Sequence, residues 1–259
     1  MGADTSFSLH GRVAVVIGGE GVLAGEIALG LAEAGADVVI SGVNAERAEE
    51  RVRSIRSATG RDAIGVVADA TRREELERLL QTTLDHYGRV DVLLNGAGIN
   101  SGTSFFEITE EEWQRILDVN LKSVFLACQV FGKAMVDSGR GGSIINISSV
   151  SSGPPLSKVF TYGITKAGVN QITQFLGREL APYGVRVNAI LPGFFPAEQN
   201  RKLLTEERTA SILAHTPMAR FGEARELVGA AVYLASDAAS SFVTGSILRV
   251  DGGFTAMTI

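Results

Sequence analysis

Residues 13–25 read VAVVIGGEGVLAG, an apolar β-branched run followed by a glycine-rich turn and the start of a helical pattern. Read from Gly19, the turn fits the pattern G-x-G-x-x-A. Small residues there let the chain turn sharply, and they bring backbone N–H groups against a pyrophosphate at the helix N-terminus. Tight packing alone could also require such a turn. The strand before it and the helix after it favour a dinucleotide site, whose expected lining is Gly18, Gly19, Gly21, Val22 and Leu23.

Similar apolar runs recur along the chain, separated by longer segments in which apolar residues repeat at helical spacing. The expected strands are residues 13–17, 38–40, 64–67, 90–94, 143–147, 185–191 and 247–250, and the expected helices are 23–34, 45–58, 73–86, 110–136, 162–181 and 224–236. The strands are apolar almost throughout, as in a parallel sheet that helices cover on both faces. This order predicts a doubly wound (Rossmann) α/β fold with seven parallel strands, in a single domain spanning residues 1–259.

One segment, residues 192–217, interrupts this alternation. It follows a predicted strand and carries three prolines around a helical pattern at 200–214. Ligands of α/β sheets bind beyond the carboxyl ends of the strands, so this excursion is expected to form a lid over the site. Its Arg201 could pair with a substrate carboxylate, and its His215 could face the substrate. The three histidines are widely separated and lack ligand spacing, so no metal site is expected.

Charge and composition exclude other classes of partner. The formal net charge is −5, and the 24 Lys and Arg residues are scattered, so no surface is expected to bind a nucleic acid backbone. The single cysteine, Cys128, lies in an apolar helical pattern, which predicts a buried, inert thiol and a reducing compartment. No uncharged apolar run reaches membrane-spanning length, and the first residues do not resemble a signal peptide. We therefore expect a soluble, cytoplasmic protein that does not bind a membrane.

Tyr162 and Lys166 lie one helical turn apart. At that spacing a phenol and an ammonium group can point into the same cleft. An unperturbed phenol has a pKa near 10, and a nearby cation favours the phenolate, so Lys166 is expected to lower the pKa of Tyr162 and make it a useful acid and base. A half-buried tyrosine beside a solvated lysine is the other interpretation of the pair alone.

The end of the second predicted strand bears on the choice of cofactor. NAD-binding folds of this type place a carboxylate there for the ribose hydroxyls, but this chain reads Ser41-Gly42-Val43-Asn44. Without that carboxylate a 2′-phosphate is not repelled, and Ser41, Asn44 or Arg47 could hydrogen-bond it. Glu20 in the glycine turn nevertheless adds a negative charge nearby. The sequence leaves NADP and NAD open and leans toward NADP.

Several motifs occur in the order and spacing of one family: residues 18–24, residues 95–98, Asn120, Ser148-Ser149, Tyr162 with Lys166, and Pro192-Gly193. From about Leu9 to the C-terminus the chain resembles the short-chain dehydrogenases/reductases. This resemblance implies a nicotinamide-dependent oxidoreductase in which Tyr162 exchanges a proton with the substrate and Lys166 activates the phenol. It also implies that Ser149 holds the reacting oxygen, and that Asn120 anchors a water linking the lysine to solvent.

The same resemblance implies further cofactor contacts: Asp69, Asn95, Gly96, Ala97, Gly98, Tyr162, Lys166, Pro192, Gly193 and Phe195. For Asp69, which would meet the adenine ring, a turn-initiating role is equally open. Departures from the family pattern are Ile17 for a threonine, Val22 and Ala24 for glycines, and Ala197 for a threonine that contacts the nicotinamide. These departures are expected to affect cofactor affinity and to leave the reacting groups unchanged.

Within the family, the chain is most similar to sugar-acid and polyol dehydrogenases such as the gluconate 5-dehydrogenases. The substrate is therefore expected to be a small secondary alcohol or ketone. One rival is a 3-oxoacyl-[acyl-carrier-protein] reductase, which would need a basic surface for its acidic carrier, and no such cluster is obvious. A rival of another class is a dinucleotide-binding regulator without catalysis, suggested by the altered glycine turn.

Relatives commonly form tetramers by packing the two long helices, here residues 110–136 and 162–181, against partner subunits. The resemblance therefore implies a homotetramer. Trp113 and Phe105-Phe106 are expected to serve in packing or in such a contact. Thr109 is a good N-cap for the helix that Glu110-Glu111-Glu112 opens, and these acidic residues complement the helix dipole rather than form a substrate site.

Overall fold

The computed structural model describes residues 6–196 and 204–257, and its core is one seven-stranded parallel sheet. The strands are β1 (Val13–Ile17), β2 (Asp37–Gly42), β3 (Ala63–Val67), β4 (Val92–Asn95), β5 (Gly142–Ile147), β6 (Val185–Pro192) and β7 (Ile247–Val250). They lie in the order β3-β2-β1-β4-β5-β6-β7. The predicted doubly wound α/β fold is confirmed, and each strand ends within two residues of its predicted limits.

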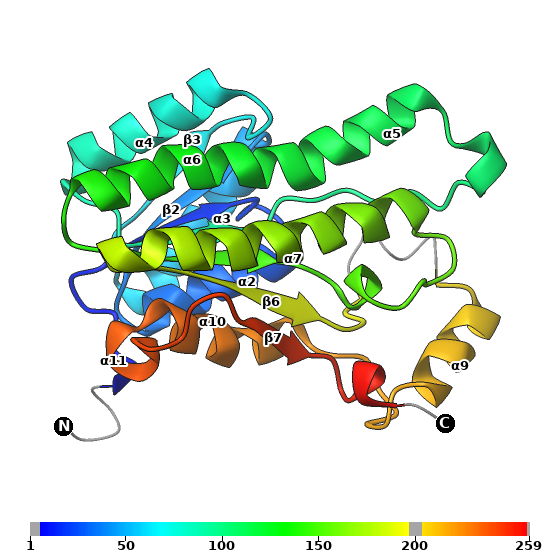
Figure 1. The fold of residues 1–259 in the computed structure, drawn as a ribbon. Coiled ribbons are helices and arrows are strands. Elements are labelled where there is room, and N and C mark those ends of the chain that lie inside the picture. The colour runs from blue at the N-terminus through cyan, green and yellow to red at the C-terminus, as the bar shows by residue number, and fades with distance from the viewer. Residues whose placement is uncertain (1–5, 197–203, 258–259) are drawn as a thin grey trace.

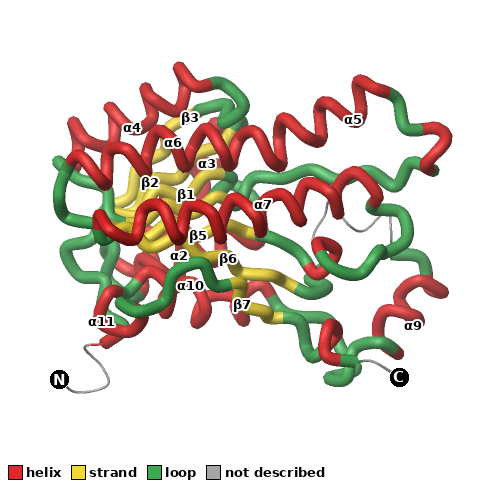
Figure 2. The backbone as a smooth tube through the Cα atoms, viewed as in Figure 1, coloured by secondary structure: helices red, strands yellow, loops and turns green. Residues whose placement is uncertain are grey.

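Helices cover both faces of the sheet, as Figures 1 and 2 show. One face carries α2 (Val22–Glu33), α3 (Ala45–Thr59) and α10 (Val228–Ala235), and the other carries α4 (Arg73–Tyr87), α6 (Ser123–Asp137) and α7 (Phe160–Leu180). Along β1, Ala14 and Val16 join the first apolar core, whereas Val13, Val15 and Ile17 join the second. Because both faces are buried, apolar residues are favoured at every strand position, which explains the unbroken apolar runs.

The order of the strands reverses at β1, which has β2 on one side and β4 on the other. At the carboxyl end, Ile17 of β1 pairs with Ser41 of β2 and with Asn95 of β4. The crossover that follows β1 returns to one side of it, and the crossover that leaves β3 leads to the other side. A crevice therefore opens beyond these strand ends, and this is where open α/β sheets bind ligands.

The predicted helix at 110–136 has three parts. α5 (Glu110–Leu117), a π-helical turn (Asp118–Lys122) and α6 follow one another without a break. Single π turns inside α-helices occur frequently at functional sites, and this one contains Asn120. The predicted cap is confirmed, because Thr109 Oγ1 accepts a hydrogen bond from the backbone N–H of Glu112 at 3.2 Å.

Among the described residues, the continuous stretch Glu110–Asp137 is long and apolar enough to cross a membrane by length and composition alone. In the fold, 56% of its most apolar window is buried. Phe131 and Met135 of α6 are completely covered in the core between helices and sheet. Packing on the sheet thus accounts for the apolar face of this stretch. Cys128 lies here as predicted: burial raises the pKa of its thiol to about 12, so the thiol is inert.

The excursion at 192–217 is described in part. The predictions for Ala197 and Arg201 concern residues 197–203, which lie outside the described residues. The helix predicted at 200–214 is α9 (Glu206–Ala214), which begins after Thr205, an N-cap whose Oγ1 accepts the N–H of Arg208 at 3.2 Å. Figure 1 shows α9 at the end of the molecule toward which β6 and β7 point, on the same side as the start of α5.

The helix predicted at 224–236 begins differently. A 3₁₀ turn (Ala224–Leu227) precedes α10, and a short helix, α11 (Asp237–Ser240), follows it. The 3₁₀ turn carries a capping box, in which the side chains of Glu223 and Glu226 each accept from the other's backbone N–H. This tighter first turn brings Leu227 into the core behind α2.

Candidate active site

A cavity of about 1330 Å³ opens beyond the carboxyl ends of the central strands. Residues that follow β1, β4, β5 and β6 form its floor, and residues of α5, α7 and α9 form its walls. Its position is the crevice that the strand order defines. The fold itself places the candidate residues, because they follow strands or lie on the helices that line this edge.

The glycine turn presents its backbone to the cavity. Gly18 has a φ of +75°, and a β-carbon there would lie 2.7 Å from the backbone nitrogen of Ala97, so another residue would not fit without a shift. α2 begins after Gly21 with neither a side-chain cap nor an acidic residue in its first turn. The first N–H groups of α2 and the positive end of its dipole are therefore open to an anion, and the turn fits a pyrophosphate.

Lys166 lies on the inner face of α7 and is 3% exposed. Its Nζ donates a hydrogen bond to the backbone oxygen of Ile147, the last residue of β5, at 2.8 Å. Burial lowers the pKa of Lys166 from 10.5 to about 8. Because that pKa still lies above neutral pH, the group is mostly an ammonium at pH 7 and places a positive charge at the base of the cavity.

Tyr162 lies one turn before it, with Lys166 Nζ 5.5 Å from the centre of the phenol ring. Burial raises the pKa of Tyr162, and an interaction with the Ser149 side chain lowers it by less. The sequence predicts that Lys166 lowers this pKa. In the structure the net direction is upward instead, because the loss of water around the phenol outweighs its interaction with Ser149.

Ser149 begins the short turn after β5 and reaches the phenol from the facing wall. Its Oγ accepts hydrogen bonds from the N–H and the hydroxyl of Ser151, at 3.2 and 2.9 Å. Those bonds leave the Ser149 hydroxyl hydrogen available for another acceptor. Ser148 has a structural role, because it is buried and its Oγ donates to the backbone oxygen of Lys166 at 3.3 Å.

Asn120 is completely buried in the π turn. Its Oδ1 accepts the N–H of Ile99 at 2.8 Å, and its Nδ2 donates to the Ile99 carbonyl at 2.8 Å. A β-carbon on Gly98 would lie 3.5 Å from Asn120 Oδ1 and 3.6 Å from Lys166 Nζ. The absence of that β-carbon leaves a small space beside the lysine, of the kind that the predicted water between Asn120 and Lys166 requires.

Most of the predicted cofactor residues line the cavity: Gly18, Gly21, Val22, Leu23, Asp69, Gly96, Ala97, Gly98, Tyr162, Lys166, Pro192, Gly193 and Phe195. Four others do not line it: Gly19, Ser41, Asn44 and Asn95. Asn95 is buried within the sheet and donates to Asn146 Oδ1 at 2.8 Å, so its side chain joins two strands instead. Ser41 is fully buried, and Asn44 caps α3 by accepting the N–H of Arg47 at 3.0 Å.

Asp69 combines its two alternative roles. Its Oδ1 accepts from the backbone N–H and the hydroxyl of Thr71, at 2.9 and 2.8 Å, and this fixes the turn after β3. The residue also lines the cavity, on the side of the glycine turn where an adenine ring would extend. The turn therefore holds Asp69 in the place from which it could contact a cofactor.

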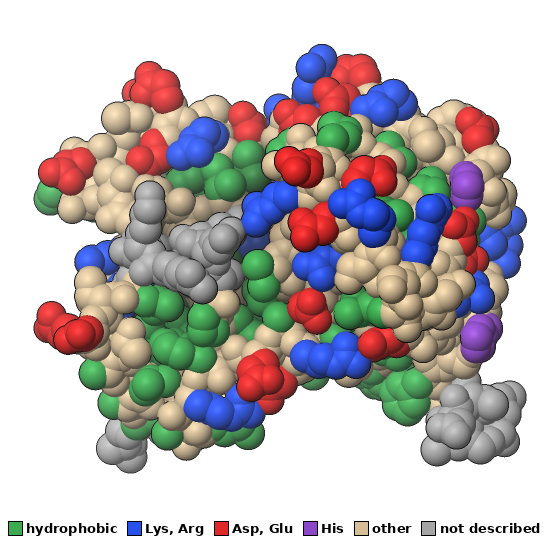
Figure 3. Space-filling view, turned by 180° about the vertical axis from the view of Figure 1, so that it is seen from behind, with side chains coloured by type: hydrophobic (Ala, Val, Ile, Leu, Met, Phe, Trp, Pro, Cys, Tyr) green, Lys and Arg blue, Asp and Glu red, His purple; other side chains and the backbone are tan. Residues whose placement is uncertain are grey.

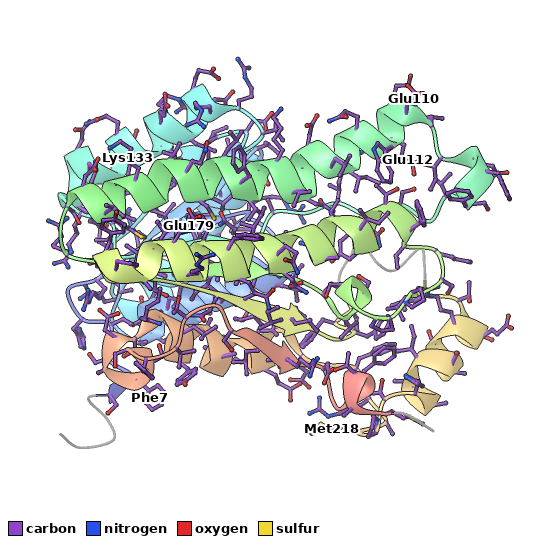
Figure 4. All side chains as sticks on the ribbon, in the orientation of Figure 1. Phe7, Glu110, Glu112, Lys133, Glu179 and Met218 are labelled. Atoms are coloured by element: carbon purple, nitrogen blue, oxygen red, sulfur yellow. The ribbon has the colours of Figure 1, made fainter. Side chains whose placement is uncertain are left out.

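α5 contributes more to the cavity than the sequence indicates. Glu110 and Glu111 line it, together with Trp113, although the acidic run is expected only to complement the helix dipole. Figure 4 labels Glu110 at the start of this helix, far from Lys133. Trp113 and Phe105 both approach Phe160, with ring centres 6.3 and 4.9 Å apart, whereas Phe106 is 96% exposed, so the choice between packing and a subunit contact stays open for these residues.

The far wall contains residues that sequence reasoning missed or misplaced. Arg208 of α9 lines the cavity and was not predicted as a site residue. The only feature of the sequence that points to it is its position in the excursion after β6. His215 does not line the main cavity, in contrast to the suggestion that it faces the substrate. Its ring packs against Phe254, with centres 4.7 Å apart, beside a smaller hollow of about 450 Å³. Within residues 6–196 and 204–257, no group of three or more metal-ligating side chains converges.

Comparisons with known proteins agree with this geometry. The model of the family described as "Enoyl-(Acyl carrier protein) reductase" matches residues 20–255. A 2-dehydro-3-deoxy-D-gluconate 5-dehydrogenase of Escherichia coli (strain K12) is 36% identical over 253 residues, which cover 97% of this chain and 98% of that protein. A 3-oxoacyl-[acyl-carrier-protein] reductase of Synechocystis sp. is 37% identical over 246 residues, covering 95% and 98%.

A solved structure is equally similar over the whole fold. A gluconate 5-dehydrogenase from Burkholderia cenocepacia J2315, in complex with NADP and tartrate, superimposes with a TM-score of 0.94. It is 34% identical and covers 99% of this chain and 100% of its own. One assignment follows from the fold, from the cavity with Tyr162, Lys166 and Ser149, and from these relatives. The chain belongs to the short-chain dehydrogenase/reductase family of NAD(P)-dependent oxidoreductases.

Proposed function

We propose that the protein interconverts a secondary alcohol and a ketone on a small sugar acid. The observation that carries this proposal is the convergence of Tyr162, Ser149 and Lys166 on one side of the cavity. The glycine turn that would hold a nicotinamide dinucleotide lies on the other side. When bound, that cofactor supplies or accepts the hydride. The residues of this chain hold the substrate oxygen and move its proton.

In the direction of oxidation, Tyr162 first releases its own proton to solvent past Lys166, and the phenolate then takes the hydroxyl proton of the substrate as the carbonyl forms. Its pKa is raised by burial, so the phenolate is short-lived unless a cation lies near. Lys166, an ammonium group at neutral pH, supplies that charge from below the ring. The Ser149 hydroxyl hydrogen-bonds the reacting oxygen, and its bonds from Ser151 hold it in place. In the direction of reduction, Tyr162 returns the proton.

A carboxylate on the substrate is supported by Arg208. This residue lies in the first turn of α9, where the helix dipole disfavours a cation. It is held there by Ser157, whose Oγ and carbonyl accept from its guanidinium at 2.6 and 2.9 Å. The side chain lines the cavity. A cation held at this place against the dipole suits an anionic group of the substrate, and the relatives named for gluconate derivatives act on such acids.

Reduction of a 3-oxoacyl group on a carrier protein is the second candidate, because one relative bears that name. A carrier protein is acidic and would need a basic surface near the cavity. On the face shown in Figure 3, Lys and Arg side chains are interspersed with Asp and Glu and do not gather into one patch. The sugar-acid assignment therefore has the better support.

A steady-state assay with hexonates, their keto acids, neutral polyols and an acetoacetyl thioester, each with NAD(H) and NADP(H), tests the proposal. Turnover should be fastest with a sugar acid or its keto acid. Tyr162→Phe should lower kcat by about 10²–10⁴-fold, measured at saturating cofactor, in a protein that still binds the dinucleotide. Tyr183→Phe, on an exposed tyrosine outside the cavity, is the matched control. Cofactor binding without turnover on any substrate would contradict the proposal and support the regulator.

We also propose that the protein is a cytoplasmic homotetramer. Support for the assembly comes from large apolar side chains that stay exposed on the two long helices: Phe125 of α6 and Phe160, Ile164 and Phe175 of α7, between 40% and 60% exposed. A monomer rarely leaves such residues together in water. Sedimentation velocity tests the assembly, and a single species at the mass of one chain would contradict it.

A further inference from the structure

The side chain of Glu20 lies at the carboxyl end of β2, although Glu20 belongs to the glycine turn after β1. Its Oε1 accepts the backbone N–H of Val43 at 3.1 Å. A β-carbon on Gly42 would lie only 1.7–2.0 Å from the Glu20 carboxyl atoms. The carboxylate therefore occupies the space that a side chain at the end of β2 would fill. Gly42 does not have a positive φ, so its backbone conformation does not require a glycine. A glycine is needed here because it leaves room for the Glu20 carboxylate.

This is the place where a dinucleotide on this fold would present its adenosine ribose. Glu20 and Gly42 both line the cavity, next to the turn that fits the pyrophosphate. In folds of this type, an acidic residue at the end of the second strand hydrogen-bonds the ribose hydroxyls. This chain lacks that residue on β2 itself, but Glu20 brings a carboxylate to the same point from the neighbouring loop.

One oxygen of this carboxylate lacks a partner. Within the described residues, Glu20 Oε2 is buried and makes no hydrogen bond. A buried carboxylate oxygen without a donor is costly, and because Oε2 has almost no accessible surface, a donor in the cavity reaches it only when the Glu20 side chain turns toward the cavity. A ribose hydroxyl is a donor of the right kind, whereas a 2′-phosphate has only acceptors and would bring a second negative charge close to the first.

Two of the three residues that could offset that repulsion are otherwise engaged. Of the three that the sequence suggests for a 2′-phosphate, Ser41 is buried outside the cavity lining and Asn44 caps α3. Arg47 does line the cavity, and it has a further interaction of its own. We propose that Glu20 is the ribose-recognising residue of this chain and that it makes the site prefer NAD, with its free 2′-hydroxyl, over NADP.

This inference rests on the proposed function only in assuming that a nicotinamide dinucleotide binds. The sequence at the end of β2 leaves the choice between NADP and NAD open and leans toward NADP. The proposed role of Glu20 narrows this choice to a preference for NAD. Because the recognising carboxylate comes from the glycine turn, the pair Glu20 and Gly42 should be replaced together to change the preference. The cofactor bound by a relative is then no guide to this chain unless the relative also carries that pair.

Titration of NADH and NADPH into the full-length protein, followed by nicotinamide fluorescence, measures the preference without turnover. Adenosine 5′-monophosphate and adenosine 2′,5′-bisphosphate serve as competitors that lack the nicotinamide. The wild-type protein should bind NADH at least tenfold more tightly than NADPH. Glu20→Gln should tighten NADPH at least tenfold and weaken NADH. Glu26→Gln, which removes a carboxylate of α2 that pairs with Arg51 outside the cavity, is the matched control and should leave the ratio unchanged.

Gly42→Ala provides a second test that alters no charge. The new β-carbon would displace the Glu20 carboxylate, so the ratio of affinities should shift in the same direction as in Glu20→Gln. Circular dichroism melting confirms that each variant is folded. Equal or tighter binding of NADPH by the wild-type protein, or a ratio unchanged in Glu20→Gln, would overturn the inference and leave the proposed function intact. If both dinucleotides fail to bind, both proposals are wrong.

Discussion

Replacing Lys166 by methionine should stabilise the fold near neutral pH while it removes activity. Burial lowers the pKa of Lys166 from 10.5 to about 8, whereas the unfolded chain keeps the ordinary value. At about 1.4 kcal/mol per pH unit, the ammonium group costs the folded state about 3.4 kcal/mol wherever both states are protonated. Losing the bond from Nζ to the Ile147 carbonyl, 2.8 Å long, offsets about 1–2 kcal/mol of this. The expected net gain at pH 7 is about 1–2 kcal/mol.

The stability gained by the methionine variant depends on pH, and the lowered pKa of Lys166 sets the sign of this dependence. Below pH 8 both states carry the proton on Lys166, so the cost of the ammonium group is constant. Between pH 8 and 10.5 the unfolded state binds this proton more than the folded state does, and the contribution of Lys166 to stability rises with pH. The advantage of the methionine variant should therefore shrink by about 2.5 kcal/mol from pH 7 to 10, where the variant becomes the less stable protein.

Urea unfolding across this pH range measures the difference. Comparing Tyr162→Phe with Tyr162→Phe/Lys166→Met removes the neighbouring phenol, whose titration is coupled to that of the lysine. Lys133→Met is the matched control, because Lys133 is exposed on α6 and its ion pair with Asp137 should contribute at most about 0.5 kcal/mol, without that pH dependence. A difference that changes by less than about 1 kcal/mol from pH 7 to 10 would refute the argument that burial depresses the pKa of Lys166.

Three further predictions concern the site and the assembly. Gly98→Ala fills the space between Asn120 Oδ1 and Lys166 Nζ, so kcat measured at saturating cofactor should fall about tenfold or more, and NADH affinity measured by fluorescence separates this loss from weaker cofactor binding. Arg208→Gln should raise the KM for a sugar acid about tenfold or more and leave that for a neutral polyol unchanged; equal changes for both would exclude carboxylate recognition. If the protein is the proposed tetramer, Phe175→Glu should shift it to smaller species in sedimentation velocity, and an unchanged assembly would place the interface elsewhere.

The sheet could be predicted from the sequence because its physical cause is local. A strand buried on both faces favours apolar residues along its whole length, and the run at 13–17 shows this without any tertiary information. The run at 185–191 departs from it at Arg186 and Asn188, which are buried and hydrogen-bonded to residues beyond α10. Strand ends were harder to predict. β2 continues through Ser41 to Gly42 because these residues pair with β3, and pairing across strands is not visible in a local pattern.

The π turn at Asp118–Lys122 could not be predicted, because one extra residue hardly alters an apolar helical pattern. The only signal was Asn120 itself, a polar residue that is mildly unfavourable inside a helix. The structure supplies the reason for the cost. The side chain of Asn120 satisfies both backbone groups of Ile99, and by this it holds the loop after β4 against α7.

The predicted cofactor residues also divide into those that could be placed from the sequence and those that could not. The glycines at 96 and 98 could be placed at the cavity from their motif, because backbone approach there depends on the missing β-carbon alone. The roles of individual side chains could not be predicted without the structure. Asn95 belongs to the same motif but points into the sheet, where it bonds to Asn146. Glu20 counts in the sequence only as a charge near the turn, and its position over Gly42 depends on how two loops meet.

The altered glycine turn gives no reason to assign this chain a silent role. The third small residue of the turn lets the helix lie close to the sheet, and this chain has Ala24 there. A β-carbon on Gly96 would lie 2.6 Å from the Ala24 methyl group. The Ala24 methyl group therefore fits only because residue 96 is a glycine. The close approach of α2 to β4 is therefore kept, because Gly96 has no β-carbon to meet Ala24. Since the N-terminus of α2 is also open, the turn keeps the features that a pyrophosphate site requires.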